Sequence, residues 1–123
     1  MDEITTGLRG VVSAVVGIED TAIALGSGDV EVLATPRVVA MVEAAAIAAL
    51  GGRLAISTTS VGTHIDLRHL APSQLGAVVT ASAEVTAVER RTITFSVEAH
   101  MVDTLIADGT HTRVVVRREG FGA

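Results

Sequence analysis

The side chain in this sequence that most needs a chemical explanation is the carboxylate of Glu43. It is the only charge between Arg37 and Arg53, within an apolar run from Val38 to Leu50. Because that run is apolar on every side of a 3.6-residue period, it predicts a helix buried all round. A buried carboxylate without a partner is costly or shifts its pKa. Glu43 is therefore either paired with an arginine or kept there for chemistry.

Two further residues could join this carboxylate in a set that activates a nucleophile or a water. Thr35 precedes Pro36 and is expected to be the N-cap of the same helix, where free backbone N–H groups could hold an acyl-transfer oxyanion. His69 ends the strand expected after the helix and could act as general base or acid. Glu43 lies eight residues beyond Thr35, a rise of about 12 Å, so a third group or a neighbouring subunit must fill the gap.

The other histidines are weaker candidates. His64 and His100 fall on polar strand rows, where exposure to solvent is expected. His111 shares a strand face with Arg113 and could line a pocket. The spacing of the histidines matches no metal-ligand pattern, and the sequence has no phosphate loop or dinucleotide fingerprint. Neither a metal nor a cofactor is expected.

Composition narrows the class of protein further. With 123 residues, 49% of them apolar, a single domain over residues 1–123 is expected, and the mean hydropathy of +0.54 favours a subunit interface. The net charge of −5, without Trp or Tyr, disfavours a nucleic-acid partner. No apolar stretch reaches the ~18 residues of a membrane span. The acidic start at Asp2 and Glu3 and the lack of cysteine together favour a cytoplasmic protein.

Periodicity predicts the elements that position these residues. Residues 11–25 are rich in apolar branched side chains and suit one or two strands, followed by a loop over residues 26–29. Thr35-Pro36 predicts the start of the central helix, and Gly51-Gly52 predicts its end.

After the helix the apolar period changes to two residues, which predicts half-buried strands. The residues expected to face inward are Val61, Thr63, Ile65 and Leu67, then Val79, Ala81, Ala83, Val85 and Ala87, then Ile93, Phe95, Val97, Ala99 and Met101. Residues 89–91 predict a tight turn, and a last strand is expected over residues 105–117. The pattern predicts an α+β fold, in which a curved antiparallel meander wraps around one long helix.

The ordered set of these segments resembles the fluoroacetyl-CoA thioesterase-like branch of the hot-dog thioesterase superfamily. The motifs that carry the resemblance, between Gly7 and Phe121, are Ala34-Thr35-Pro36, Met41-Val42-Glu43-Ala44-Ala45, Ser60-Val61-Gly62-Thr63, His69-Leu70-Ala71-Pro72-Ser73 with Gly76, and Gly109-Thr110-His111-Thr112-Arg113. The resemblance implies a hot-dog fold and a homodimer or tetramer whose sheets join. It also implies hydrolysis of acyl-CoA thioesters at sites near the dimer interface.

The resemblance assigns roles to particular residues. Thr35, Glu43 and His69 match the family's catalytic threonine, carboxylate and histidine. Gly62 matches a glycine that lines the substrate pocket, and Arg113 matches an arginine near the thioester and the pantetheine arm. Thr35 as nucleophile or as donor to a water, and Glu43 as orienter of His69 or as attacking group, stay open alternatives.

One difference from the family concerns the substrate. The fluoroacetyl-selective member places phenylalanines over its pocket from the segment before the helix, whereas residues 26–33 hold none. The expected substrate is a small or medium acyl-CoA, with no membrane partner. One alternative is an acyl-CoA-binding protein without catalysis. A hot-dog hydratase is less favoured, because such enzymes typically carry an Asp-x-x-x-x-His pattern, whereas Asp66 and His69 are only three residues apart.

Overall fold

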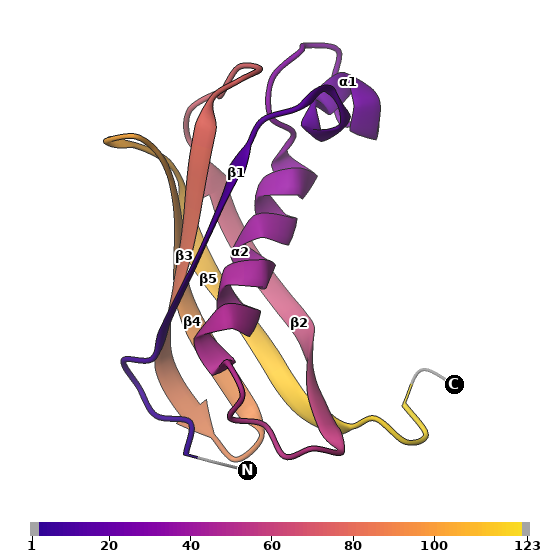
Figure 1. Cartoon of the computed structure of the whole chain (residues 1–123), viewed down its shortest axis with the longest axis vertical. Coiled ribbons are helices and arrows are strands. Elements are labelled where there is room, and N and C mark those ends of the chain that lie inside the picture. Colours follow the sequence, from indigo (N-terminus) through magenta and orange to yellow (C-terminus); the bar gives the residue numbers. More distant parts are fainter. Residues whose placement is uncertain (1–2, 122–123) are drawn as a thin grey trace.

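The chain forms one five-stranded antiparallel sheet with a long helix packed on one of its faces (Figure 1). The computed structural model describes residues 3–121, so Asp2 of the acidic start lies outside the described residues. In chain order the elements are β1 (Arg9–Val15), the 3-10 helix η1 (Ile18–Asp20), α1 (Ala22–Leu25), α2 (Thr35–Leu50), β2 (Thr58–His69), β3 (Val78–Glu89), β4 (Thr92–Met101) and β5 (Thr104–Arg117).

The strand order in the sheet is β1-β3-β4-β5-β2. β3, β4 and β5 form the predicted meander, and the predicted turn after Glu89 is confirmed. β2 departs from a simple meander, because it pairs with β5 at one edge of the sheet while β1 pairs with β3 at the other. Among the described residues no strand pairs with the outer edge of β2, which leaves twelve residues of strand edge open.

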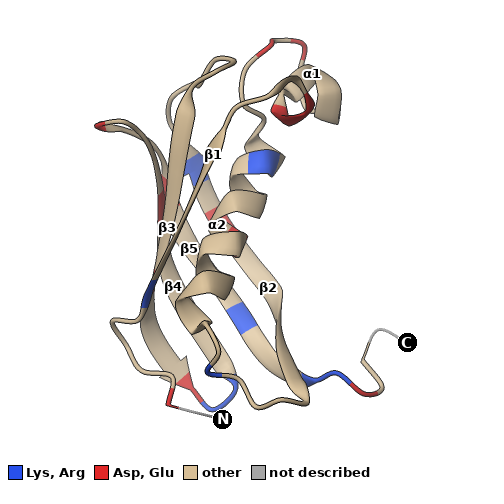
Figure 2. Ribbon diagram, viewed as in Figure 1, with Lys and Arg blue, Asp and Glu red and all other residues tan. Residues whose placement is uncertain are grey.

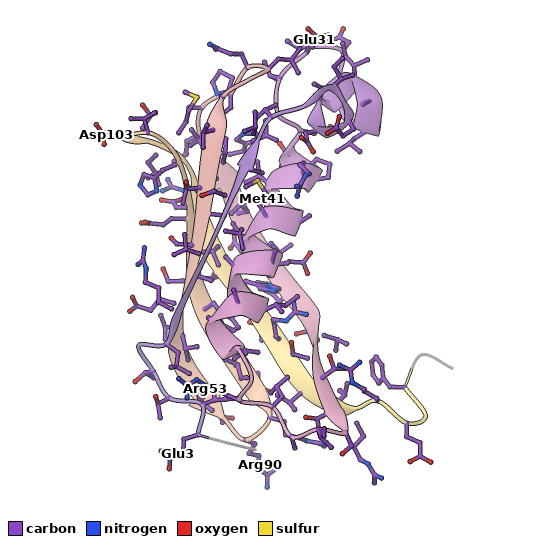
Figure 3. All side chains as sticks on the ribbon, in the orientation of Figure 1. Glu3, Glu31, Met41, Arg53, Arg90 and Asp103 are labelled. Carbon is purple, nitrogen blue, oxygen red and sulfur yellow. The ribbon has the colours of Figure 1, made fainter. Side chains whose placement is uncertain are left out.

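The core forms where α2 packs on the sheet. The buried side of α2 consists of Val38, Met41, Val42, Ala45, Ala46, Ala49 and Leu50, and Figure 3 labels Met41 on the helix. The opposite side of α2 is open, and its exposed residues include Pro36, Ala40, Ala44, Ile47 and Ala48. The prediction of a helix buried all round is therefore wrong for a single chain, because the sheet covers only one side.

Residues 18–25 form short helices, so the prediction of strand structure through residue 25 is wrong beyond Val15. Local hydrogen bonds of side chains to the backbone decide this. The Asp20 carboxylate accepts from the Gly17 N–H at 2.8 Å, and the Thr21 hydroxyl accepts from the Ala24 N–H at 3.2 Å. The Gly17 hydrogen bond is also the main reason why the pKa of Asp20 is lowered. The Arg37 guanidinium donates to Asp20 at 2.8 Å and ties this segment to the start of α2.

Two β-bulges change which residues face the helix. The register of β2 against β5 shifts between Gly62 and His64, so Gly62 lies opposite Arg113 and shares its face. The prediction that Val61 faces inward is therefore wrong. A second shift, between Val85 and Ala87, leaves Ala87 exposed, although the preceding inward row of β3 is buried as predicted.

Charged residues lie mostly at the two ends of the molecule and in loops (Figure 2). Figure 3 shows Arg53 and Arg90 at one end and Glu31 and Asp103 at the other. Glu43 in the middle of α2 and Arg113 in β5 are among the exceptions. Within residues 3–121, no helix has the length and apolar character that crossing a membrane requires.

Candidate active site

Thr35 and His69 are in direct contact at the start of α2. The Thr35 Oγ1 lies 2.7 Å from the His69 Nδ1. The prediction that Thr35 is the N-cap is wrong, because Ala34 occupies that position and Thr35 is the first helical residue, with no side-chain cap. The hydroxyl of Thr35 is therefore free to pair with the imidazole. The expected set of free backbone N–H groups is not found at this helix start, because Pro36 has no N–H and the N–H groups of Ala34 and Arg37 donate to the carbonyls of Asp20 and Ala34.

The environment of His69 favours a neutral imidazole. Its Nε2 is buried and has no hydrogen-bond partner among the described residues. Burial lowers the pKa of His69, and a smaller opposing contribution comes from the backbone of Ala71. A neutral imidazole at pH 7 can accept a proton, which is the state that a general base needs.

A cavity of about 250 Å³ opens beside this pair. Its lining is mainly aliphatic and consists of Ala22, Ser27, Val32, Leu33, Ala34, Thr35, His69, Leu70, Ala71 and Pro72. An apolar pocket with two convergent polar groups is typical of a small-molecule site.

Glu43 lies in a second group of residues, in the middle of α2. Its Oε2 is 3.6 Å from the Arg113 Nη1, and its side chain is 39% exposed. The ion pair with Arg113 agrees with the alternative that Glu43 is paired with an arginine. The prediction that the Glu43 side chain is buried is wrong for the single chain. Gly62 makes the approach possible, because a Cβ at that position would lie 2.6 Å from the Glu43 Oε2.

Arg113 is buried, only 5% exposed, and held by hydrogen bonds. Its Nε donates to the Ser60 Oγ at 2.8 Å, and its Nη2 donates to the Ser60 carbonyl at 3.0 Å. Its Nη1 lies 3.1 Å from the His111 Nε2, and the His111 Nδ1 lies 2.8 Å from the His64 carbonyl. His111 also stacks on Phe95, with ring centroids 6.0 Å apart.

The sequence missed Ser60 as part of this group. The expected alternation placed Val61 on the inner face of the strand, which put Ser60 on the outer one. The bulge after Gly62 reverses this assignment, and Ser60 faces inward with Arg113. A glycine within a strand, the usual mark of a bulge, was the available signal.

The two groups stay apart within one chain. Glu43, Gly62, His64 and His111 line a cavity of about 210 Å³ that shares no lining residue with the one at Thr35. His69 lies seven residues beyond Gly62 on β2, a distance of roughly 20 Å along an extended strand. Among residues 3–121, no cluster of His, Asp and Glu has an arrangement that could hold a metal ion.

The buried histidines give stability a pH dependence. Burial lowers the pKa of both His69 and His111, so the unfolded chain binds more protons than the folded chain near pH 6. We expect the free energy of unfolding to be highest above the unfolded pKa of about 6.5 and to fall as the pH is lowered toward about 5. Urea titrations across this range measure it.

Two variants test whether the buried histidines cause this pH dependence of stability. His111→Gln removes a titrating group and should flatten the slope of stability against pH. Asp20→Asn should leave that slope unchanged, because the lowered pKa of Asp20 acts only below about 3.8. An equal slope in wild type and His111→Gln would contradict the assignment.

Comparisons with known proteins identify the family of this chain. A family model described as fluoroacetyl-CoA-specific thioesterase matches residues 16–119. The fluoroacetyl-CoA thioesterase of Streptantibioticus cattleyicolor is 38% identical over 93 residues, which cover 76% of this chain and 67% of that protein.

Solved structures resemble nearly the whole chain. A mutant of the fluoroacetyl-CoA-specific thioesterase FlK, in complex with fluoroacetate and CoA, superposes with a TM-score of 0.88 at 32% identity, covering 96% of this chain and 99% of that chain. A hot-dog-like protein from Thermanaerovibrio acidaminovorans superposes with a TM-score of 0.83 at 26% identity, covering 92% of this chain and 84% of that chain.

The fold is that of the hot-dog thioesterases. Within that class, the chain belongs to the fluoroacetyl-CoA-specific thioesterase family, and it is a thioester hydrolase. The predicted hot-dog fold and enzyme class are thereby confirmed. The roles of individual residues stay predictions.

Proposed function

We propose that the chain hydrolyses a small or medium acyl-CoA thioester with Thr35, His69 and Glu43, at a site completed by a second copy of the chain. The observation that carries this proposal is the contact of 2.7 Å between the Thr35 hydroxyl and the His69 imidazole, beside an aliphatic cavity at the start of α2. A nucleophile or water held by a neutral imidazole beside an apolar pocket is an arrangement that supports acyl transfer.

The reaction divides between the residues as follows. The thioester carbonyl lies at the start of α2, where the positive end of the helix dipole polarises it. His69 takes a proton from the Thr35 hydroxyl or from a water that this hydroxyl positions. The oxygen adds to the carbonyl carbon, the C–S bond breaks, and the CoA sulfur leaves with a proton from the imidazolium. Water supplies the second oxygen of the carboxylic acid, directly or by hydrolysis of an acyl-threonine.

A second copy supplies what one chain lacks. Antiparallel pairing of two β2 edges brings the His69 end of one strand alongside the earlier residues of the other. Glu43 next to Gly62 then approaches the partner's Thr35–His69 pair more closely than its own. The open edge of β2 and the exposed apolar side of α2 support this homodimer.

The same pairing supports the binding of CoA. Arg53 and Arg90 lie at the end of the molecule away from Glu31 and Asp103, close to where β2 begins (Figure 3). Antiparallel copies bring Arg53 and Arg90 of one chain toward the Thr35 end of the other, where the CoA phosphates need positive charge.

The acyl group is expected to be apolar. The relative FlK was crystallised with fluoroacetate and CoA, but residues 26–33 of this chain hold no phenylalanine to close over a two-carbon acyl group. The Thr35 cavity is lined by small aliphatic side chains and has room for a longer chain. We therefore expect better turnover of a short or medium aliphatic acyl-CoA than of fluoroacetyl-CoA.

Thiol release from a panel of acyl-CoA esters tests the proposal. The chain has no cysteine, so the protein adds no thiol signal of its own. We expect turnover of at least one ester, and a decrease in kcat of about 100-fold or more in His69→Ala, because a positioned acid–base group is lost. His100→Ala is the matched control and should keep wild-type turnover.

Other results would redirect the assignment. Equal turnover in wild type and His69→Ala would remove His69 from the mechanism. Retention of an acyl-CoA ester by the folded protein without thiol release would favour a binding protein over an enzyme.

A further inference from the structure

We propose that Ala22 determines the length of the acyl group, because its small side chain leaves the cavity beside Thr35 deep enough for a straight aliphatic chain of medium length. The inference rests on the proposed function and deepens it by naming the residue that sets the substrate range. It is carried by the position of Ala22 in the cavity wall, by the bonds that hold α1 in place, and by the close approach of Gly28 to Ala22.

Ala22 belongs to the wall of the cavity that also holds Thr35 and His69. It is 9% exposed, whereas the other residues of α1, from Ile23 to Leu25, are exposed. Figure 1 shows α1 at the end of the molecule where α2 begins. The side chain of Ala22 is therefore the part of α1 that an acyl group in this cavity can reach.

The chain between Ala22 and the reacting group gives the depth of the cavity. The Ala22 N–H donates to the Val32 carbonyl at 2.8 Å, and Val32 precedes Thr35 by three residues. Val32 and Leu33 each form an isolated β-bridge, and the backbone of Ala34 is extended. Three extended residues span roughly 10 Å. An acyl group whose carbonyl lies at Thr35 therefore meets Ala22 only when its chain is of medium length.

An ion pair and a backbone hydrogen bond attach α1 to the start of α2. The Arg37 Nε donates to the Asp20 carboxylate at 2.8 Å, and the Ala34 N–H donates to the Asp20 carbonyl at 2.9 Å. Asp20 lies two residues before Ala22, and Arg37 lies two residues after Thr35. Asp20 is only 8% exposed, so solvent and salt screen this pair less than a surface pair. The separation of Ala22 from Thr35 is thereby fixed.

The loop after α1 leaves a larger side chain at position 22 little room outside the cavity. A Cβ on Gly28 would lie 3.3 Å from the Ala22 Cβ, so the backbone of Gly28 already packs close to this methyl group. A leucine at position 22 would therefore extend into the cavity of about 250 Å³. Because α1 is held in place through Asp20, that side chain would occupy the space of the far end of the acyl chain.

Substitution of Ala22 is expected to change the preferred acyl length. The wild type should have a higher kcat/KM with hexanoyl-CoA than with acetyl-CoA, because the added methylene groups are buried against the aliphatic lining. In Ala22→Leu the ratio of these two kcat/KM values should fall about 30-fold or more. Ala24→Leu, at an exposed position of the same helix, is the matched control and should keep the ratio within about 2-fold. An unchanged ratio in Ala22→Leu, or a wild type that prefers acetyl-CoA, would overturn the inference.

Ala22→Val is a smaller increase in side-chain volume and serves if leucine impairs folding. The ratio of the two kcat/KM values should fall about 5-fold in this variant. Thermal unfolding shows whether each variant is folded. A folded Ala22→Val in which the ratio rises or stays constant would contradict the role of Ala22.

Binding of CoA thioethers gives a measurement that does not depend on turnover. S-hexyl-CoA and S-ethyl-CoA lack the thioester carbonyl and are not hydrolysed. By calorimetry, Ala22→Leu should raise the Kd of S-hexyl-CoA about 10-fold or more relative to the Kd of S-ethyl-CoA. An equal change for both thioethers would overturn the inference. Tighter binding of S-hexyl-CoA by a wild type that releases no thiol would instead count against the proposed function alone, and binding of neither thioether would overturn both.

Discussion

Glu43→Gln is expected to lower kcat for thioester hydrolysis by about 100-fold or more while the protein stays folded. The amide keeps the size of the carboxylate but removes the negative charge that stabilises an imidazolium or attacks the carbonyl. Folding should be nearly unaffected, because the side chain is 39% exposed and its ion pair among residues 3–121 is the 3.6 Å contact with Arg113. Steady-state kinetics with the best ester of the panel measure the change.

The division between kcat and KM identifies the role of Glu43. A decrease in kcat at constant KM means that the carboxylate acts in the transition state. Glu98→Gln on β4 is the matched control, since Glu98 is exposed on the outer face of the sheet. Full turnover in Glu43→Gln would remove Glu43 from the mechanism and leave Thr35 and His69 to act alone.

Most of the architecture was predictable because its signals are local. Thr35-Pro36 and Gly51-Gly52 gave the bounds of α2 to within a residue. Strict alternation predicted the buried rows of β3 and β4 up to the bulge at Ala87. Thr35, Glu43 and His69 were singled out for reasons of chemistry, since each is a polar group at a helix start, in an apolar run or at a strand end.

The departures have physical reasons that a sequence does not display. Alternation says which face a residue occupies but not which strand lies beside it, so the place of β2 at the sheet edge was not predicted. The bulge at Gly62 adds one unpaired residue, so the residues of β2 before it lie on the opposite face from the one that alternation predicts. Ser60 therefore faces inward, which the sequence pattern did not predict. At residues 18–25, hydrogen bonds that the side chains of Asp20 and Thr21 accept from backbone N–H groups outweigh the apolar pattern.

The separation of Glu43 from His69 is the departure with the most consequence. The sequence left a gap of about 12 Å between Thr35 and Glu43, to be filled by a third group or a neighbouring subunit. Within one chain, Thr35 contacts His69 and Glu43 contacts Arg113, so no described residue of the same chain joins Thr35 to Glu43. Local patterns place both groups but contain no signal for the second copy that would join them.

Gly10→Ala is expected to lower the free energy of unfolding by about 3 kcal/mol or more, a large share of the stability of a domain this size. A Cβ on Gly10 would collide with the carbonyl oxygen of Ala45 and the amide nitrogen of Ala49, which belong to the backbone of α2. No side chain can rotate to relieve this contact, so α2 must move away from β1 and open the core.

Gly52→Ala makes the same chemical change where nothing lies within 4 Å, and it should alter stability by less than about 0.5 kcal/mol. Urea denaturation of both variants provides the comparison, and equal midpoints would mean that α2 and β1 do not pack as closely as described. A shift of α2 would also displace Thr35 from His69 and Glu43 from Arg113. Any folded fraction of Gly10→Ala should therefore show a reduced kcat as well, because the helix that fills the core also carries both ends of the site.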